Sequence, residues 1–266
     1  MNIDRGAIDS AREEAEEKST KAIGNKSGPQ PKKHTDISKA KSLTRQLNII
    51  GGTVGVWALF LPFPYTLVIT VCALIPAISI FSMEKFKGHI NFETKEKKSK
   101  RPSLTFALAI PPAALAWRAV NDFHIFSFNN VWLPVLVVSI TFSALIWMYS
   151  ADMKKNPLYL LISLFIGLMY GYGLVIAMNC LTDRSMPEYY DAKVLDKRIS
   201  STSESNSYYI KVTPWGPRTT EEEISIKKKG YDRIRVNDKI SIALKEGTLG
   251  IPWFLIRLQP EQRPAD

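Results

Sequence analysis

The sequence predicts an α-helical membrane domain of about five short transmembrane helices followed by a small antiparallel β domain. Three observations lead to this fold class. Long apolar runs fill residues 47–181, basic residues gather beside these runs, and apolar and polar residues alternate with a period of two after residue 187. We therefore divide the chain into a tail at 1–46, a membrane domain at 47–181, a β domain at 187–258 and a flexible tail at 259–266.

The formal net charge of +10 lies mainly beside the apolar runs. Residues 1–46 carry 10 Lys and Arg against 7 Asp and Glu, and residues 83–102 carry 7 against 3. This distribution is typical of charge that orients membrane helices, so we expect the lipid bilayer as a partner and no nucleic acid. The tail at 1–46 is also poor in aromatic residues and cannot bury a core, so we expect it to be disordered.

The first two predicted helices, 47–61 and 65–82, form a hairpin broken by proline. Pro62 and Pro64 lack backbone donors, and each disfavours helix in the residue before its ring. A helix over 47–61 rises only about 22 Å, less than the roughly 30 Å hydrocarbon core of a bilayer. A re-entrant hairpin is therefore an alternative to two full spans, and either version returns the chain to its starting side.

Three further helices are predicted at 103–120, 131–150 and 158–181. Pro111 and Pro112 should kink the first of them. In the last helix, Gly167 and Gly171 are four residues apart, a spacing that permits close contact between helices. We therefore expect this pair to form a packing face.

The distribution of basic residues between the helices predicts the orientation of the chain. Lys and Arg abound in the N-terminal flank, in residues 84–101 and at Lys154-Lys155, and they are absent from the two turns predicted on the other side. This asymmetry predicts a cytoplasmic N-terminus. Five passes then leave the β domain extracytoplasmic, in a multi-pass protein of a bacterial inner membrane.

The C-terminal segment has the alternation of five short strands. They are predicted at 190–198, 207–214, 222–229, 239–245 and 253–258. Turn-forming residues separate them, including Asn237-Asp238 and Gly247–Gly250. The expected result is a small antiparallel sheet or open barrel. Because its core would be small, we expect the sheet to lean on the membrane domain or on a second subunit.

Parts of the chain resemble known groups of proteins. The run Ser207-Tyr208-Tyr209-Ile210-Lys211-Val212, the run from Tyr231-Asp232 through Val236-Asn237-Asp238 to Ile242, and Gly247-x-x-Gly250 are similar to the β module of small bacterial membrane proteins of unknown function. Asn237 stands where that module usually has glycine. The Leu61-Pro62-x-Pro64-Tyr65 hairpin and the Arg118-Ala119 helix end resemble uncharacterised bacterial inner-membrane proteins. These resemblances imply a membrane protein with an exported β module and imply no activity.

A few side chains are candidates for interaction or for a structural role. Arg118 and Asp122 lie at the outer end of a predicted helix, where an ionisable residue can mark an ion site. We favour the interpretation that Arg118 reaches the membrane interface and pairs with Asp122. Aromatic residues of the β domain could form a binding face, although at strand spacing they more often form core or interface anchors. These aromatic candidates are Tyr208, Tyr209, Trp215 and Trp253.

No catalytic, metal or cofactor site is predicted. His34, His89 and His124 fall on both sides of the predicted membrane and cannot converge on one metal ion. The sequence has no Gly-x-Ser-x-Gly elbow and no glycine-rich loop for phosphate. Cys72 and Cys180 are expected at depths too different for a disulfide.

Two hypotheses of function follow from these observations. We favour a non-enzymatic integral membrane protein that presents an exported β domain to a protein or other envelope partner, or to a second copy of itself. The alternative is a transporter or channel subunit with a cavity at the proline-broken helices, around Pro62 and Pro111-Pro112. The near absence of charged residues from the apolar runs counts against a transporter.

Overall fold

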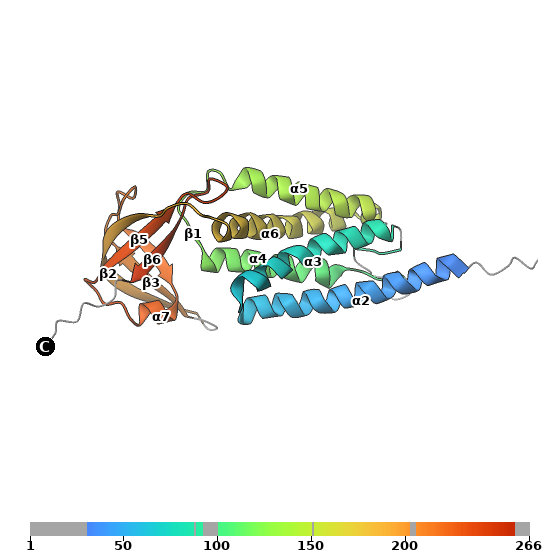
Figure 1. The fold of residues 1–266 in the computed structure, drawn as a ribbon, viewed down its shortest axis with the longest axis horizontal. Helices are drawn as coiled ribbons and strands as arrows, with labels where there is room; N and C mark the ends of the chain where they lie inside the picture. Colours follow the sequence, from blue (N-terminus) through green and yellow to red (C-terminus); the bar gives the residue numbers. More distant parts are fainter. Residues whose placement is uncertain (1–30, 88, 93–100, 151, 203–205, 259–266) are drawn as a thin grey trace, which may run out of the picture.

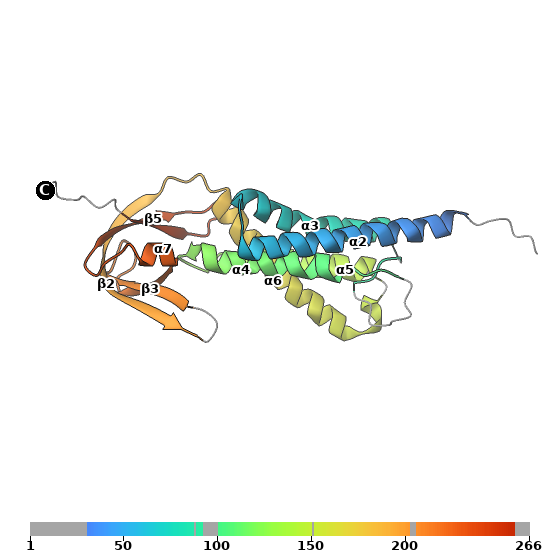
Figure 2. The same ribbon diagram turned by 90° about the horizontal axis from the view of Figure 1, so that it is seen from below.

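The computed structural model describes residues 31–87, 89–92, 101–150, 152–202 and 206–258. A bundle of long helices forms one end of the molecule and a curved antiparallel sheet forms the other (Figures 1 and 2). The chain thus has the predicted combination of a helical domain and a C-terminal antiparallel sheet. Residues 1–30 of the tail expected at 1–46, and the tail expected at 259–266, lie outside the described residues.

Five long helices form the described part of the bundle. They are α2 (Pro31–Phe60), α3 (Tyr65–Lys85), α4 (Thr105–Asp122), α5 (Trp132–Tyr149) and α6 (Pro157–Leu181), with a short 3-10 turn, η1 (Met153–Lys155), before the last. Successive helices run in opposite directions, so α2, α4 and α6 end beside the sheet (Figure 1). The loops after α3 and α5 lie at the far end of the bundle.

Three of these helices, α3, α5 and α6, are long and apolar enough to cross a membrane. They correspond to the helices predicted at 65–82, 131–150 and 158–181. α4 is less apolar because it contains two prolines together with Arg118 and Asp122. α2 is less apolar because its first half is polar.

α2 begins at Pro31, well before the predicted start at residue 47. Residues 31–46, which we expected to be disordered, are therefore helical. The reason lies in packing, because Ala40 is buried in the same apolar cluster as Ile90 and Phe92 from the loop after α3. Ala40 and Thr44 are both buried, so one face of α2 is covered beyond the end of its apolar run.

Glycine residues let two helices approach α4 closely. A Cβ on Gly51 of α2 would lie 2.8 Å from the Cα of Ala107, and a Cβ on Gly173 of α6 would lie 2.6 Å from the backbone of Leu115. Any side chain at these positions would push the helices apart. α4 therefore packs in the middle of the bundle, between α2 and α6, although it is not the most apolar helix.

The predicted packing pair, Gly167 and Gly171, lies against α5. A Cβ at Gly167 would be 2.9 Å from the carbonyl oxygen of Ser139, and one at Gly171 would be 2.7 Å from that of Val135. The close approach allows the Ser139 hydroxyl to donate to the Gly167 carbonyl at 2.9 Å. Small residues and a hydroxyl thus hold α5 and α6 together, as is common between membrane helices.

Large apolar side chains are exposed around the bundle, and all five helices contribute to this surface. They include Ile49, Val56 and Phe60 of α2, Leu67, Leu74 and Phe81 of α3, Phe106, Trp117 and Val120 of α4, Leu133, Val137 and Ile140 of α5, and Leu161 and Phe165 of α6. An exposed apolar surface of this extent is unfavourable in water and marks contact with lipid or with other apolar chains. We call it the apolar belt.

The sheet has six strands in the order β1-β6-β5-β2-β3-β4, and every neighbouring pair is antiparallel. The elements are β1 (His124–Ile125), β2 (Glu188–Ser201), β3 (Asn206–Val212), β4 (Glu222–Ile226), α7 (Lys228–Tyr231), β5 (Lys239–Lys245) and β6 (Trp253–Leu258). β2 to β6 are the five predicted strands. The boundaries of β2 to β4 differ by up to three residues, and the prediction was wrong at the end of β4, because Lys228 and Lys229 begin the short helix α7 instead of extending that strand.

Two local features shape the sheet. A register shift between Val194 and Asp196 divides β2, so that its first half pairs with β5 and its second half with β3. This irregularity bends the strand and lets the sheet curve into a half-barrel. Asn237 has a φ of 75° before β5, a left-handed conformation that glycine and asparagine adopt most easily.

β1 was not predicted. It follows α4 in a segment that we expected to be an external loop, and its two residues pair with Phe254 and Trp253 of β6. A strand of two residues is too short to show alternation in the sequence. Its position means that the sheet is built from both the helical and the C-terminal parts of the chain.

Candidate functional site

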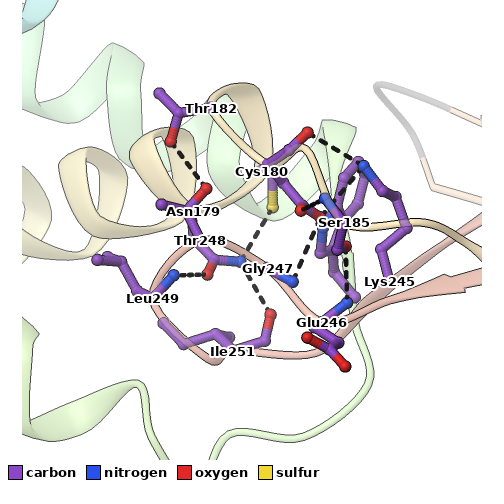
Figure 3. A network of polar contacts seen from close by, with 12 residues as sticks. Asn179, Cys180, Thr182, Ser185, Lys245, Glu246, Gly247, Thr248, Leu249 and Ile251 are labelled. Carbon is purple, nitrogen blue, oxygen red and sulfur yellow. Dashed lines mark hydrogen bonds and ion pairs between the residues drawn. The ribbon is translucent and has the colours of Figure 1, made fainter.

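A cluster of polar contacts lies where the bundle meets the sheet. It connects the end of α6 to the loop 246–252 between β5 and β6 (Figure 3). We call this region the joint, and it comprises Asn179, Asp183, Lys245, loop 246–252 and Trp253. Because the helical bundle and the sheet touch here, the joint helps to hold the sheet in place against the bundle.

Asn179 lies in the last turn of α6 and is fully buried. Its amide Nδ2 donates to the carbonyl oxygen of Ile251 at 2.9 Å, and its Oδ1 accepts from the backbone N–H of Leu249 at 2.9 Å. Its own carbonyl oxygen accepts from the N–H of Thr248 at 3.2 Å. One residue of the helix therefore pairs with three backbone groups of the loop, and its own buried amide is satisfied in return.

Gly247 allows the loop to close over this amide. Its φ is +77°, and a Cβ at this position would collide with the Asn179 amide and with the carbonyl oxygen of Ile251. Figure 3 shows the turn lying directly against the end of α6. Both the backbone conformation and the lack of space thus require glycine here.

Asp183 provides the negative charge of the joint, and its side chain is 1% exposed. Its Oδ2 accepts from the indole N–H of Trp253 at 2.7 Å and lies 3.3 Å from Nζ of Lys245. Its Oδ1 accepts from the backbone N–H of Ser185 at 2.7 Å. The carboxylate therefore connects the end of α6 to both β5 and β6.

These contacts fix the charge of Asp183. Burial raises the pKa of Asp183, but hydrogen bonds from Ser185, Trp253 and Lys245 outweigh it and bring the pKa down to about 2. The carboxylate is ionised throughout the physiological pH range. Its geometry suits a structural ion pair better than proton transfer.

Apolar residues complete the joint. Ile251 and Trp253 are buried in one cluster with Val175, Ile176 and Cys180 of α6. This cluster is separate from the main cores of the bundle and of the sheet. The β5–β6 loop therefore docks on the helices through a buried contact of its own.

Arg118 and Asp122 form a second connection near the sheet. The Arg118 guanidinium donates to the carbonyl oxygens of Ala58 and Leu59, both at 2.6 Å, at the end of α2. It also lies 3.5 Å from the Asp122 carboxylate, so the pairing that we favoured is present. Arg118 thus caps the last turn of α2, immediately before the proline-containing turn.

Asp122 continues this connection into the β domain. Its carboxylate is 7% exposed, accepts from the Tyr65 hydroxyl at 3.0 Å and lies 2.9 Å from Nζ of Lys227. Lys227 stands between β4 and α7. The contact therefore joins α3 and α4 of the bundle to the far side of the half-barrel.

Comparison of the chain with profiles of protein families, with curated proteins and with solved structures finds no match.

The four predicted aromatic candidates do not share one surface. Trp253 lies in the joint, and Trp215 is buried in the core of the sheet with Phe254. Tyr208 and Tyr209 are adjacent in β3 and so point to opposite faces of the strand. The structure thus gives these residues several separate environments and no common face.

The described residues gather no metal site. No three His, Cys, Asp or Glu side chains among them are close enough to hold an ion. Cys72 and Cys180 are buried free thiols. His124, in β1, stacks on Phe254 with ring centroids 5.1 Å apart.

The sequence did not reveal Asp183, Lys245 or Gly247 as members of one site. Asp183 and Lys245 are 62 residues apart, and charged residues at the ends of a helix and a strand are ordinary in a sequence. Asn179 likewise carries no local sign of its partners, which lie about 70 residues later. Only the folded arrangement connects them.

Proposed function

We propose that this protein is a multi-pass inner-membrane protein whose helical bundle holds the half-barrel β domain in a fixed orientation outside the cytoplasm, where it binds a protein or another component of the envelope. In this proposal all five helices are embedded. α2 and α4 join the three apolar helices because both expose large apolar side chains in the apolar belt and both pack tightly within the bundle.

The observation that carries the proposal is the origin of β1. This strand comes from the connection between α4 and α5, yet it forms one edge of the sheet. A β domain tethered only through the end of α6 could rotate freely. Pairing with β1 and docking at the joint together support a rigid presentation of the half-barrel.

The distribution of charge supports the proposed orientation. Lys39, Lys41, Lys85, Lys87 and Lys154 lie in or beside the ends of helices remote from the sheet. The turn at 61–64 and the connection at 123–131, both on the sheet side, contain no Lys or Arg. Short loops rich in basic residues stay in the cytoplasm, so the sheet would face outward.

Labelling of single cysteines tests the orientation. In a variant that lacks both native thiols (Cys72→Ala, Cys180→Ala), Thr219→Cys places a thiol on an exposed loop of the β domain and Lys87→Cys places one at the far end of the bundle. A membrane-impermeant maleimide added to intact spheroplasts should label Thr219→Cys alone. Labelling of Lys87→Cys before permeabilisation would contradict the proposal.

The outer face of the sheet tests the binding function. Tyr189 and Leu255 are both paired with Ala243, and both are exposed, at 53% and 37%. Tyr189→Ser combined with Leu255→Ser should abolish a crosslink between the β domain and its partner in intact cells. Val236→Ser, at an exposed apolar residue in a loop, is the matched control and should leave it unchanged. An unaltered crosslinking pattern in the double variant would reject this face as the binding surface.

A further inference from the structure

An open groove of about 470 Å³ lies at the end of the bundle away from the sheet, between α2 and the start of α4. Lys41, Thr44, Arg45 and Asn48 line it from α2. Their spacing of three, four and seven residues places them on one face of the helix. The groove is large enough for a small ligand or a lipid headgroup.

A buried hydroxyl in the wall of the groove lacks a partner. Thr44 is 2% exposed, and its Oγ1 makes no hydrogen bond to any residue that the structure describes. By contrast, both polar atoms of the neighbouring Asn48 have partners: its Nδ2 donates to the carbonyl of Ser103 at 2.7 Å, and its Oδ1 accepts from the Ala107 N–H at 3.0 Å. Buried polar groups are rarely left unpaired, so the Thr44 hydroxyl points to a ligand in the groove.

Two cations stand beside this hydroxyl. Lys41 and Arg45 are exposed, are one helical turn apart, and form no ion pair within the described part of the chain. A lysine and an arginine flanking a hydroxyl donor supply the chemistry that recognises a phosphate group. The ligand is therefore expected to be anionic.

The groove is apolar on its other side. Ile49 and Phe106, which also line it, are 57% and 59% exposed and belong to the apolar belt. Ile49 follows Arg45 by four residues, a rise of about 6 Å along the helix. The basic residues thus lie just beyond the edge of the apolar belt, where the headgroups of a bilayer would be.

We propose that this groove binds the headgroup of an anionic phospholipid. The phosphate sits between Lys41 and Arg45 and accepts a hydrogen bond from the Thr44 hydroxyl, while an acyl chain follows Ile49 and Phe106. A lipid accounts for both the charged and the apolar wall, whereas a free phosphate ion would account only for the first. This inference rests on the membrane insertion argued under the proposed function.

The preference of the full-length protein for two spin-labelled lipids tests the inference. The protein is placed in phosphatidylcholine vesicles that contain a trace of labelled phosphatidylglycerol or labelled phosphatidylcholine, and the fraction of motionally restricted lipid is measured. We expect phosphatidylglycerol to associate about fivefold more strongly. Lys41→Gln combined with Arg45→Gln should reduce this ratio to about one.

A matched variant separates a defined site from general attraction to a basic surface. Lys39→Gln combined with Lys87→Gln removes the same charge from the same end of the bundle, but neither residue lines the groove. This variant should keep most of the preference. Thr44→Val, which preserves charge and shape, should lower the ratio about threefold.

Each result bears on the proposal. An equal loss in the Lys39/Lys87 variant, an unchanged ratio in Thr44→Val, or equal binding of the two lipids to the wild type would overturn it. Displacement of the lipid by millimolar inorganic phosphate at constant ionic strength would assign the groove to a free anion and would also overturn it. Carbonate extraction checks insertion in parallel: an inserted protein without lipid preference refutes the groove alone, whereas an extracted protein refutes the proposed function as well.

Discussion

Trp253 donates its indole N–H to the Asp183 carboxylate at 2.7 Å, across 70 residues of sequence. Asp183 lies just after the end of α6, and Trp253 is the first residue of β6. The same indole ring contacts Phe123, which precedes β1, with ring centroids 5.9 Å apart. The first residue of β6 thus connects the ends of α4 and α6, and this arrangement makes the stability of the joint measurable through single side chains.

Asp183→Asn should weaken the joint substantially. The change leaves Nζ of Lys245 beside a neutral group and weakens the hydrogen bond from Trp253, so we expect a loss of about 2–4 kcal/mol in the free energy of unfolding. This loss is measured by urea denaturation in detergent, with tryptophan fluorescence as the signal of unfolding. Asp191→Asn removes an exposed carboxylate from the same domain and should change little. Equal effects of the two variants would show that the joint contributes no special stability.

The pKa of Asp183 predicts an acid-dependent loss of stability. Its pKa is lowered from 3.8 to about 2 in the folded protein, so folding favours the ionised form. The resulting stabilisation, about 2 kcal/mol, is fully present above roughly pH 5 and is lost as the pH falls toward 2. Unfolding free energies measured between pH 5 and pH 2 should show this slope in the wild type and a shallower slope in Asp183→Asn. Identical slopes would contradict the assignment.

Alanine substitutions at two glycines separate close packing from backbone strain. Gly247 and Gly250 both have positive φ, at 77° and 66°. A Cβ at Gly247 would also collide with the Asn179 amide, whereas a Cβ at Gly250 would meet nothing closer than 3.9 Å.

Gly250→Ala should therefore cost about 1 kcal/mol, the strain of a left-handed alanine. Gly247→Ala should cost about 3 kcal/mol or more, because the loop must also move away from α6. Thermal unfolding in detergent compares the two variants with the wild type. Similar costs would mean that the loop does not need its close contact with Asn179.

The sequence predicted those elements whose signal is local and repeated. The strands β2 to β6 alternate over five residues or more, and α3, α5 and α6 are apolar over their length, so both patterns were visible without a structure. The start of α2 was missed because residues 31–46 are mostly polar, and the burial of Ala40 in the core of the bundle depends on residues distant in the sequence. A polar helix that is stabilised by packing against distant residues has no apolar pattern of its own.

The joint could not be predicted for a similar reason. Each contact of Asn179 with the β5–β6 loop spans about 70 residues, and nothing in the local sequence specifies such a pairing. The local sequence also does not predict β1. Its two residues form a strand because they pair with β6, and not because of a local preference. Gly247-x-x-Gly250 indicated a turn, but only the position of Asn179 explains why Gly247 has no space for a side chain.

Arg118→Lys tests whether the guanidinium fork, and not merely its charge, holds the end of α2. Arg118 donates from two nitrogens to the carbonyls of Ala58 and Leu59 while it pairs with Asp122. A lysine ammonium keeps the charge, but it lacks the planar fork that serves these acceptors together. We expect a loss of about 2 kcal/mol in the free energy of unfolding.

Amide hydrogen exchange localises this effect. In Arg118→Lys, exchange should accelerate in the last turn of α2 and in the turn at 61–64, while the β domain stays protected. Lys227→Gln is the matched control. The Lys227 side chain is 77% exposed, so water screens its pairing with Asp122, and this ion pair adds little to the free energy of unfolding. If Lys227→Gln opened the same amides, or Arg118→Lys left them protected, the end of α2 would depend on the charge of the network and not on the fork.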